Sequence, residues 1–137
     1  TDLNARIGLS QLKKLNSVVD HRIKNHAIYQ DRFKRSPDFT CQHNDRARIS
    51  SISFAALAKS SEHRDRVARS LRAAHIETRP LGGGNMSRQP FWINRYGILK
   101  LPLADRIHRA SFHLPNHPRL SEEDIHYICD TVLRNKA

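Results

Sequence analysis

Cysteine is scarce in this chain of 137 residues, since only Cys41 and Cys129 occur and they lie far apart. Two distant cysteines exclude a disulfide framework and the closely spaced Cys/His patterns of zinc modules, and they fit a reducing compartment. The sequence also lacks a signal peptide and any run of 18 apolar residues. We therefore expect a cytoplasmic protein with no membrane partner.

Sequence motifs of catalysis are missing as well. No GxSxG or Walker A pattern occurs, and none of the seven lysines lies in an apolar setting that would lower its pKa. His113 and His117 flank "LPN", but Pro115 and Pro118 favour an extended chain there, so the two imidazoles do not share a helix face. The sequence predicts no catalytic residue and no metal site within these residues.

Acidic residues are few relative to basic ones, with 13 Asp and Glu against 24 Lys and Arg, for a net charge of +11. This balance fits either an anionic partner (nucleic acid, anionic lipid or a phosphorylated small molecule) or simply a solvated basic surface. No run of five basic residues occurs, there is a single tryptophan, and no helix-turn-helix or RRM signature is present. Nucleic acid is therefore disfavoured as a partner.

Apolar residues are periodic despite their modest share of 38%. Spacings of three to five residues predict an amphipathic helix over about residues 2–34. The residues that set this pattern are Leu3, Ile7, Leu12, Leu15, Val19 and Ile23. A helix of that length spans roughly 45 Å, which exceeds what so small a domain needs. Part of it is expected to dock against something outside the chain.

The remaining sequence predicts an α/β body over about residues 47–135, so that 1–137 form a single domain. The first half of this body is expected to contain a loop over 38–46, a strand within 48–57, and a helix over 60–75 capped by Ser60 or Ser61. A strand within 76–81 and a loop over 82–90 follow. The second half is expected to contain a helix over 103–110, an extended segment over 112–118, and a helix over 121–135 that begins with a Ser121/Asp124 capping box.

The stretch "TRPLGGGNMSRQPFW" carries the most suggestive chemistry. Its glycines permit a close backbone approach to a ligand, and Arg79 and Arg88 offer forked donors suited to phosphate or carboxylate. Asn85 and Gln89 are suited to orient hydroxyl groups. These four residues are the predicted substrate-binding residues. The alternative is a surface loop with solvated arginines.

Three stretches together resemble the DegT/DnrJ/EryC1/StrS family of sugar-nucleotide aminotransferases and dehydrases. "TDLNARIGLSQLKKL" is similar to the start of that family's small C-terminal domain. "RVARSLRAAHIETRPLGGGNMSRQP" is similar to its helix followed by "TRP", and "LPLADRIHRASFHLPNHPRLSEEDIHYICDTVL" to its ending. Within the family, "TRP" with "GNMSRQP" looks closest to the branch of nucleotide-linked 4-keto-6-deoxyhexose 3-dehydrases.

The resemblance implies the small C-terminal domain of a fold-type I pyridoxal-phosphate enzyme, with a long first helix and a small, mostly antiparallel sheet covered by helices. It implies a nucleotide-linked sugar substrate, a homodimer, and a role in surface polysaccharide or lipopolysaccharide biosynthesis. In this family the large N-terminal domain holds pyridoxal phosphate, and we expect that domain to lie outside these 137 residues. The chain alone is then expected to bind no cofactor and to be inactive. The alternative is a standalone binding or regulatory module for a phosphorylated ligand or nucleic acid.

Overall fold

A four-stranded antiparallel sheet in the order β1-β2-β4-β3 forms the centre of the protein, as the computed structural model of residues 1–137 shows. The strands are β1 (Phe39–Cys41), β2 (Ser53–Ala58), β3 (Arg79–Pro80) and β4 (Ser111–Pro115). β2 and β4 pair over five residues, from Ser53 opposite Pro115 to Leu57 opposite Ser111. Alternate residues of β2, namely Phe54, Ala56 and Ala58, are buried, as the period of two requires.

Two strands depart from the sequence prediction. β2 begins at Ser53 rather than near residue 48, because Ser51 is used elsewhere: its hydroxyl lies 3.0 Å from Nδ1 of His26, and its carbonyl accepts a hydrogen bond from Asn116. β1 lies in a segment predicted to be a loop. It is too short to show a period in the sequence, and it forms because Phe39 enters the core and pairs with Ala58.

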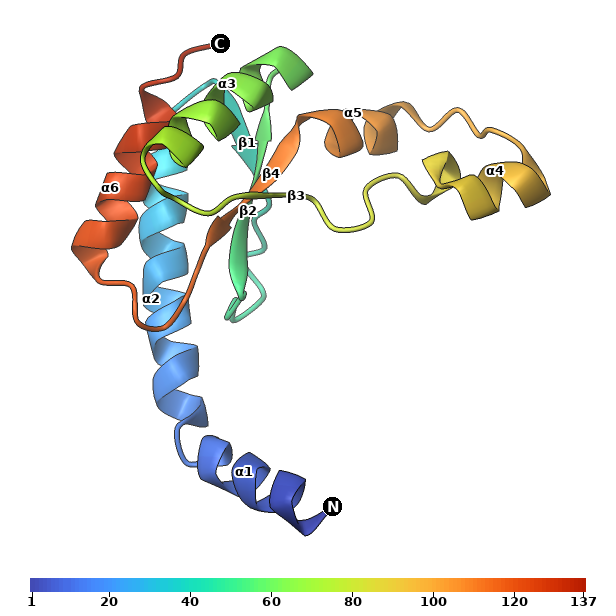
Figure 1. Ribbon diagram of the computed structural model, residues 1–137. Helices are drawn as coiled ribbons and strands as arrows, with labels where there is room; N and C mark the ends of the chain where they lie inside the picture. The colour runs from blue at the N-terminus through green and yellow to red at the C-terminus, as the bar shows by residue number, and fades with distance from the viewer.

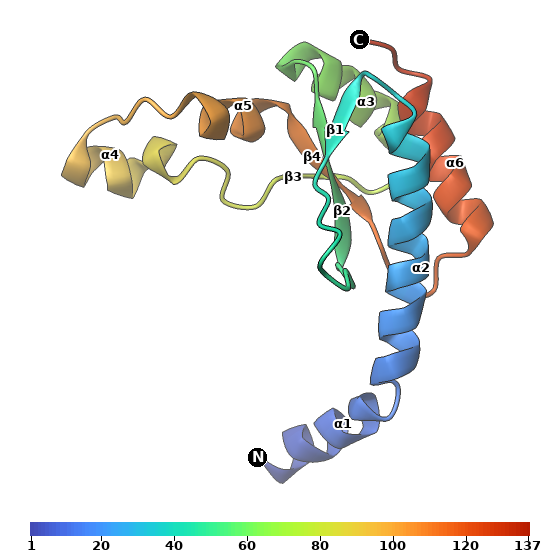
Figure 2. The same cartoon turned by 180° about the vertical axis from the view of Figure 1, so that it is seen from behind.

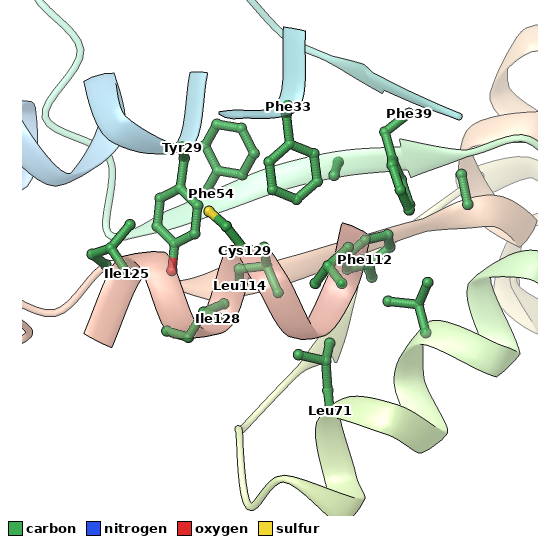
Figure 3. Close-up of a cluster of buried hydrophobic side chains, with 14 residues drawn as sticks. Tyr29, Phe33, Phe39, Phe54, Leu71, Phe112, Leu114, Ile125, Ile128 and Cys129 are labelled. Carbon is green, nitrogen blue, oxygen red and sulfur yellow. The ribbon is translucent and has the colours of Figure 1, made fainter. Parts of the chain in front are cut away.

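Three helices pack with the sheet into one core. They are α2 (Leu15–Lys34), α3 (Ser61–Ala73) and α6 (Glu122–Leu133). The core is rich in aromatic rings, with Tyr29 stacked on Phe54 at 4.7 Å between ring centroids (Figure 3). The hydroxyl of Tyr29 donates to the carbonyl of Pro115 at 2.8 Å, which ties α2 to the end of β4. The predicted caps are present: Ser60 caps α3, and Ser121 with Asp124 forms the capping box of α6.

The prediction of one helix over about residues 2–34 is wrong in one respect, because the helix is broken at Lys13 and Lys14. α1 (Asp2–Leu12) is a separate helix that leaves the line of α2 (Figure 1). At the break the Lys14 amide bonds back only three residues, to Gln11. No residue of α1 is buried, so no packing within the chain holds it in line with α2.

A second projection leaves the sheet between β3 and β4 (Figure 1). It contains the 3₁₀ helix η1 (Met86–Arg88), α4 (Pro90–Tyr96) and α5 (Pro102–Ala110) (Figures 1 and 2). We call residues 81–110 the arm. The helix over α5 was predicted; α4 was not. No helix of the fold combines the length and apolar character that a membrane span requires.

Candidate functional site

The Gly-rich loop leaves β3 and forms the base of the arm. Gly83 and Gly84 both have positive φ, at 74° and 54°, a region that glycine adopts without strain. Gly84 also has no room for a side chain, because a Cβ at this position would overlap Nδ1 of His108 on α5. The loop therefore lies directly against α5, and the glycine makes that approach possible.

Asp105 on α5 is the anchor of this loop. Arg88 donates to both carboxylate oxygens of Asp105, from Nε at 2.8 Å and from Nη2 at 2.7 Å. Asn85 Nδ2 donates to the same carboxylate at 2.8 Å. The hydrogen bonds from Arg88, and then from Asn85, hold the pKa of Asp105 well below its ordinary value, and the bond to Asp105 raises the pKa of Arg88. We call Asn85, Arg88 and Asp105 the clamp.

Asn85 is fully occupied by the fold. Its side chain is 2% exposed, and its Oδ1 accepts from both the amide and the hydroxyl of Ser87. Its own backbone amide donates to Nδ1 of His108 at 3.2 Å. Every polar atom of this amide side chain thus has a partner within the chain, which gives Asn85 a structural part in holding the loop.

Arg79 and Gln89 are more open. Arg79 is exposed and donates twice to one oxygen of Glu77, at 2.9 and 2.6 Å. Gln89 donates from Nε2 to the carbonyl of Gly83 at 3.1 Å, and its Oε1 has no partner in the chain. The structure thus brings Asn85, Arg88 and Gln89 together in one loop, while Arg79 forms no hydrogen bond with them.

Sequence reasoning overlooked the α5 side of the site. Asp105 and His108 are three residues apart in "ADRIHRA", a spacing that places them on one face of a helix. The sequence signal for this side of the site was an acid and an imidazole on one helix face, in a chain that also has a Gly/Arg/Asn loop. Neither residue stands out on its own in a sequence with nine histidines and 13 acids.

The loop is a surface rather than an enclosed pocket. A hollow of about 600 Å³ lies between α2 and residues 39–49, and none of the four predicted residues lines it. Arg79 and Arg88 keep part of their side chains in solvent. A ligand on this loop therefore needs a second wall supplied from outside these residues.

These residues do not by themselves fit a pyridoxal-phosphate pocket. A lysine amine enclosed by the protein is what such a cofactor requires for its covalent attachment, and all seven lysine side chains are exposed. Burial raises the pKa of both thiols, Cys41 and Cys129, to about 12, so neither is a nucleophile at neutral pH. No three His, Cys, Asp or Glu side chains gather as a metal site.

Large apolar side chains are exposed on α1, at the start of α2 and on the arm. Five come from residues 3–15 and eight from residues 86–107, and only Ile52 and Tyr127 lie elsewhere. The set is Leu3, Ile7, Leu9, Leu12, Leu15, Met86, Phe91, Tyr96, Ile98, Leu99, Leu101, Leu103 and Ile107. Exposed apolar surface on this scale marks a docking face.

Comparison with known proteins gives a single family. The profile of the DegT/DnrJ/EryC1/StrS aminotransferase family matches residues 1–133. The lipopolysaccharide biosynthesis protein RfbH of Salmonella typhimurium is 28% identical over 134 residues, which cover 93% of this chain and 31% of that protein. The GDP-4-keto-6-deoxy-D-mannose 3-dehydratase of Yersinia pseudotuberculosis is 34% identical over 86 residues, 61% of this chain and 22% of that protein.

A solved structure shares the fold. The PLP form of the putative sugar aminotransferase Spr1654 from Streptococcus pneumoniae superposes with a TM-score of 0.87 at 22% identity, covering 98% of this chain and 35% of that one. The predicted fold class is thereby confirmed. This chain spans about a third or less of the length of each of these proteins.

Proposed function

Because the chain belongs to the DegT/DnrJ/EryC1/StrS aminotransferase family, we propose that it is the small C-terminal domain of a pyridoxal-phosphate-dependent enzyme. Its substrate is a nucleotide-linked 4-keto-6-deoxy sugar, and the product serves lipopolysaccharide or other surface polysaccharide synthesis from the cytoplasm. The reaction is a transamination or a 3-dehydration. RfbH and the Yersinia 3-dehydratase support this proposal by their names and by their similarity to this chain, which covers 93% of it for RfbH and 61% for the 3-dehydratase.

The observation that carries the proposal is the clamped loop. Its backbone is fixed before any ligand arrives, because Asp105 holds Arg88 and Asn85 and because His108 packs on Gly84. A preorganised loop binds without an ordering cost. The loop is also open to solvent on one side, as a shared binding surface must be.

Each predicted residue then has a part in binding. Arg79 and the exposed part of Arg88 neutralise the diphosphate of the nucleotide, for which guanidinium groups are suited by charge and shape. The free Oε1 of Gln89 accepts from a sugar hydroxyl. Asn85 is buried and contributes indirectly, because its hydrogen bonds with Ser87 hold the loop in its shape.

Pyridoxal phosphate, when bound by the large domain, supplies the electron sink for the reaction. The residues of this chain bind and orient the sugar nucleotide beside it. The apolar faces of α1 and the arm are where the cofactor-binding domain and a second subunit of a homodimer pack. Such packing covers the exposed side chains and supplies the second wall that the loop lacks.

The experiment is to purify the protein encoded by the complete reading frame that contains these residues. We expect the absorbance of bound pyridoxal phosphate, and turnover of a GDP-linked 4-keto-6-deoxy sugar to an amino or 3-deoxy sugar. A protein that carries no cofactor and processes no such sugar would contradict the proposal. The isolated 137-residue chain is the control, and it is expected to form no adduct with the cofactor after borohydride reduction.

A further inference from the structure

The basic residues of this protein are dispersed in sequence, but the fold gathers some of them on one face. Arg66, Arg69 and Arg72 lie three residues apart on α3, and all are exposed. With a rise of about 1.5 Å per residue, their Cα atoms follow one another at roughly 4.5 Å along the helix. None of the three is among the arginines that form ion pairs with carboxylates in this structure.

The end of the chain adds two more cations to this face. Arg134 and Lys136 are exposed, and the segment that carries them is fastened to α3 by three hydrogen bonds. Arg66 donates to the Lys136 carbonyl at 2.9 Å, Ser70 to Asn135 Oδ1 at 3.0 Å, and His63 Nε2 lies 2.7 Å from the Asn135 carbonyl. We call Arg66, Arg69, Arg72, Arg134 and Lys136 the α3 face.

Acidic groups neutralise the α3 face only in part. Asp65 is paired with Arg64 at 2.7 Å. Hydrogen bonds are the main cause of the lowered pKa of Glu62 and of Asp38; Arg66 adds to the first and Lys136 to the second, but neither cation forms an ion pair with its carboxylate. α3 and the C-terminus lie together at the end of the molecule opposite α1 (Figures 1 and 2). The α3 face also contains none of the large exposed apolar side chains. The apolar side chains that mark α1 and the arm as docking faces therefore do not include the α3 face.

We propose that the α3 face is a peripheral contact for a bilayer surface that carries anionic phospholipids. Five unpaired cations on one side of a helix and its neighbouring segment match a plane of phosphate groups, which guanidinium groups bind well. The face has no exposed aromatic ring on which bases stack, so it is poorly suited to a single nucleic-acid strand. It also has no apolar wedge, so the contact is electrostatic, reversible and weakened by salt.

This contact differs from what the sequence alone predicts. The sequence shows no basic run and suggests no membrane partner, because Arg72 and Arg134 are far apart along the chain. Only the docking of residues 134–136 on α3 brings the two groups of cations together. The proposal does not depend on the enzymatic function, since it concerns a face outside the Gly-rich loop and the arm.

The test is co-sedimentation of the full chain with vesicles of phosphatidylglycerol and phosphatidylcholine, compared with vesicles of phosphatidylcholine alone. We expect binding to the anionic vesicles only, with loss as ionic strength rises. The variant Arg66→Gln/Arg69→Gln/Arg72→Gln is expected to bind about 100-fold more weakly, since each cation near an anionic surface contributes roughly fivefold. The variant Arg69→Gln/Arg72→Gln keeps the Arg66 bond to Lys136 and is expected to lose about 25-fold.

The matched control removes the same charge from the opposite end of the molecule. Arg6→Gln/Lys13→Gln/Lys14→Gln changes three exposed cations at or next to α1 and should retain binding within about threefold. Equal loss in the two triple variants would overturn the proposal, because net charge alone would then explain the binding. Absence of binding to the anionic vesicles would also overturn it, as would α3-dependent binding to an RNA oligonucleotide with no vesicle binding.

Discussion

At the scale of single residues, Gly84 is where a change of one methyl group has the clearest consequence. Gly84→Ala places a Cβ against His108 and forces an alanine into positive φ. We expect a loss of about 1–3 kcal/mol in the free energy of unfolding. Gly82→Ala is the matched control, since its Cβ meets nothing within 4 Å, and it should change stability by no more than about 0.5 kcal/mol.

The double variant Gly84→Ala/His108→Ala separates the two causes. Removal of the imidazole relieves the collision but also removes the acceptor of the Asn85 amide, so His108→Ala alone is the reference. Relative to that reference the double variant keeps only the backbone strain, which costs about 1 kcal/mol. Urea denaturation of the five proteins measures these differences. Equal stability of Gly84→Ala and Gly82→Ala would show that the loop does not lie against α5 as described.

Asp105 gives a prediction for pH. Its folded pKa is depressed by hydrogen bonds, first from Arg88 and then from Asn85, so the clamp stabilises the folded state above the ordinary aspartate pKa of about 3.9. This stabilisation decreases as the pH falls below that ordinary value and is lost as the pH falls through the lower folded pKa. In a titration of the carboxyl carbon shifts by NMR, Asp105 should therefore titrate well below pH 4.

Arg88→Ala removes the principal partner of Asp105, and the midpoint of its titration should rise towards the ordinary value. A midpoint near 3.9 in the unaltered chain would mean that the clamp does not form. Glu122 lies outside the clamp, and the hydrogen bond from Lys24 lowers its pKa, so its titration should not respond to Arg88→Ala.

The residues of the site were only partly predictable from sequence. Arg79, Asn85, Arg88 and Gln89 were identified by residue type, because amides and guanidinium groups next to glycines suit a phosphorylated ligand. Their partners were not found, since Asp105 lies 17 residues beyond Arg88 and only the packing of α5 brings the two together. Whether the four residues contact a ligand remains a prediction.

At the scale of elements, local signals predicted the helices of the body well and the irregular parts poorly. The capping box of α6 has a local cause, a serine and an acid three residues apart, and it is present in the structure. No proline or glycine lies at the break between α1 and α2, so no local sequence signal predicts it. β1 exists only because Phe39 joins a core assembled from distant segments.

Ser121→Ala tests that capping box. The hydroxyl accepts from the amide of Asp124 at 3.1 Å, and its removal should lower the free energy of unfolding by about 1 kcal/mol. Ser10→Ala is the control, because Ser10 is exposed within α1 and caps nothing, and alanine there should be neutral or slightly stabilising. Equal effects of the two changes in urea denaturation would argue against the cap.

At the scale of the whole molecule, the exposed apolar faces predict association. The isolated chain should self-associate as its concentration rises, because α1 and the arm leave a dozen large apolar side chains in water. Phe91→Asp on the arm should weaken association measured by light scattering. Tyr127→Asp is the control, since Tyr127 is similarly exposed but lies on α6, away from both faces. A strict monomer at all concentrations would contradict this view of the two projections.

The most direct test of the central claim is the Michaelis constant for the sugar nucleotide in the protein encoded by the complete reading frame, before and after Arg88→Ala. A guanidinium contact to phosphate contributes about 1.5–3 kcal/mol, and the same change also releases the clamp on Asp105. We therefore expect KM to rise about tenfold to a hundredfold or more, while the absorbance of the bound cofactor is unchanged. Arg106→Ala, an exposed arginine of α5 without an ion pair, should leave KM as it was. An unchanged KM in Arg88→Ala, or loss of the cofactor with KM intact, would contradict the assignment of this loop to the substrate.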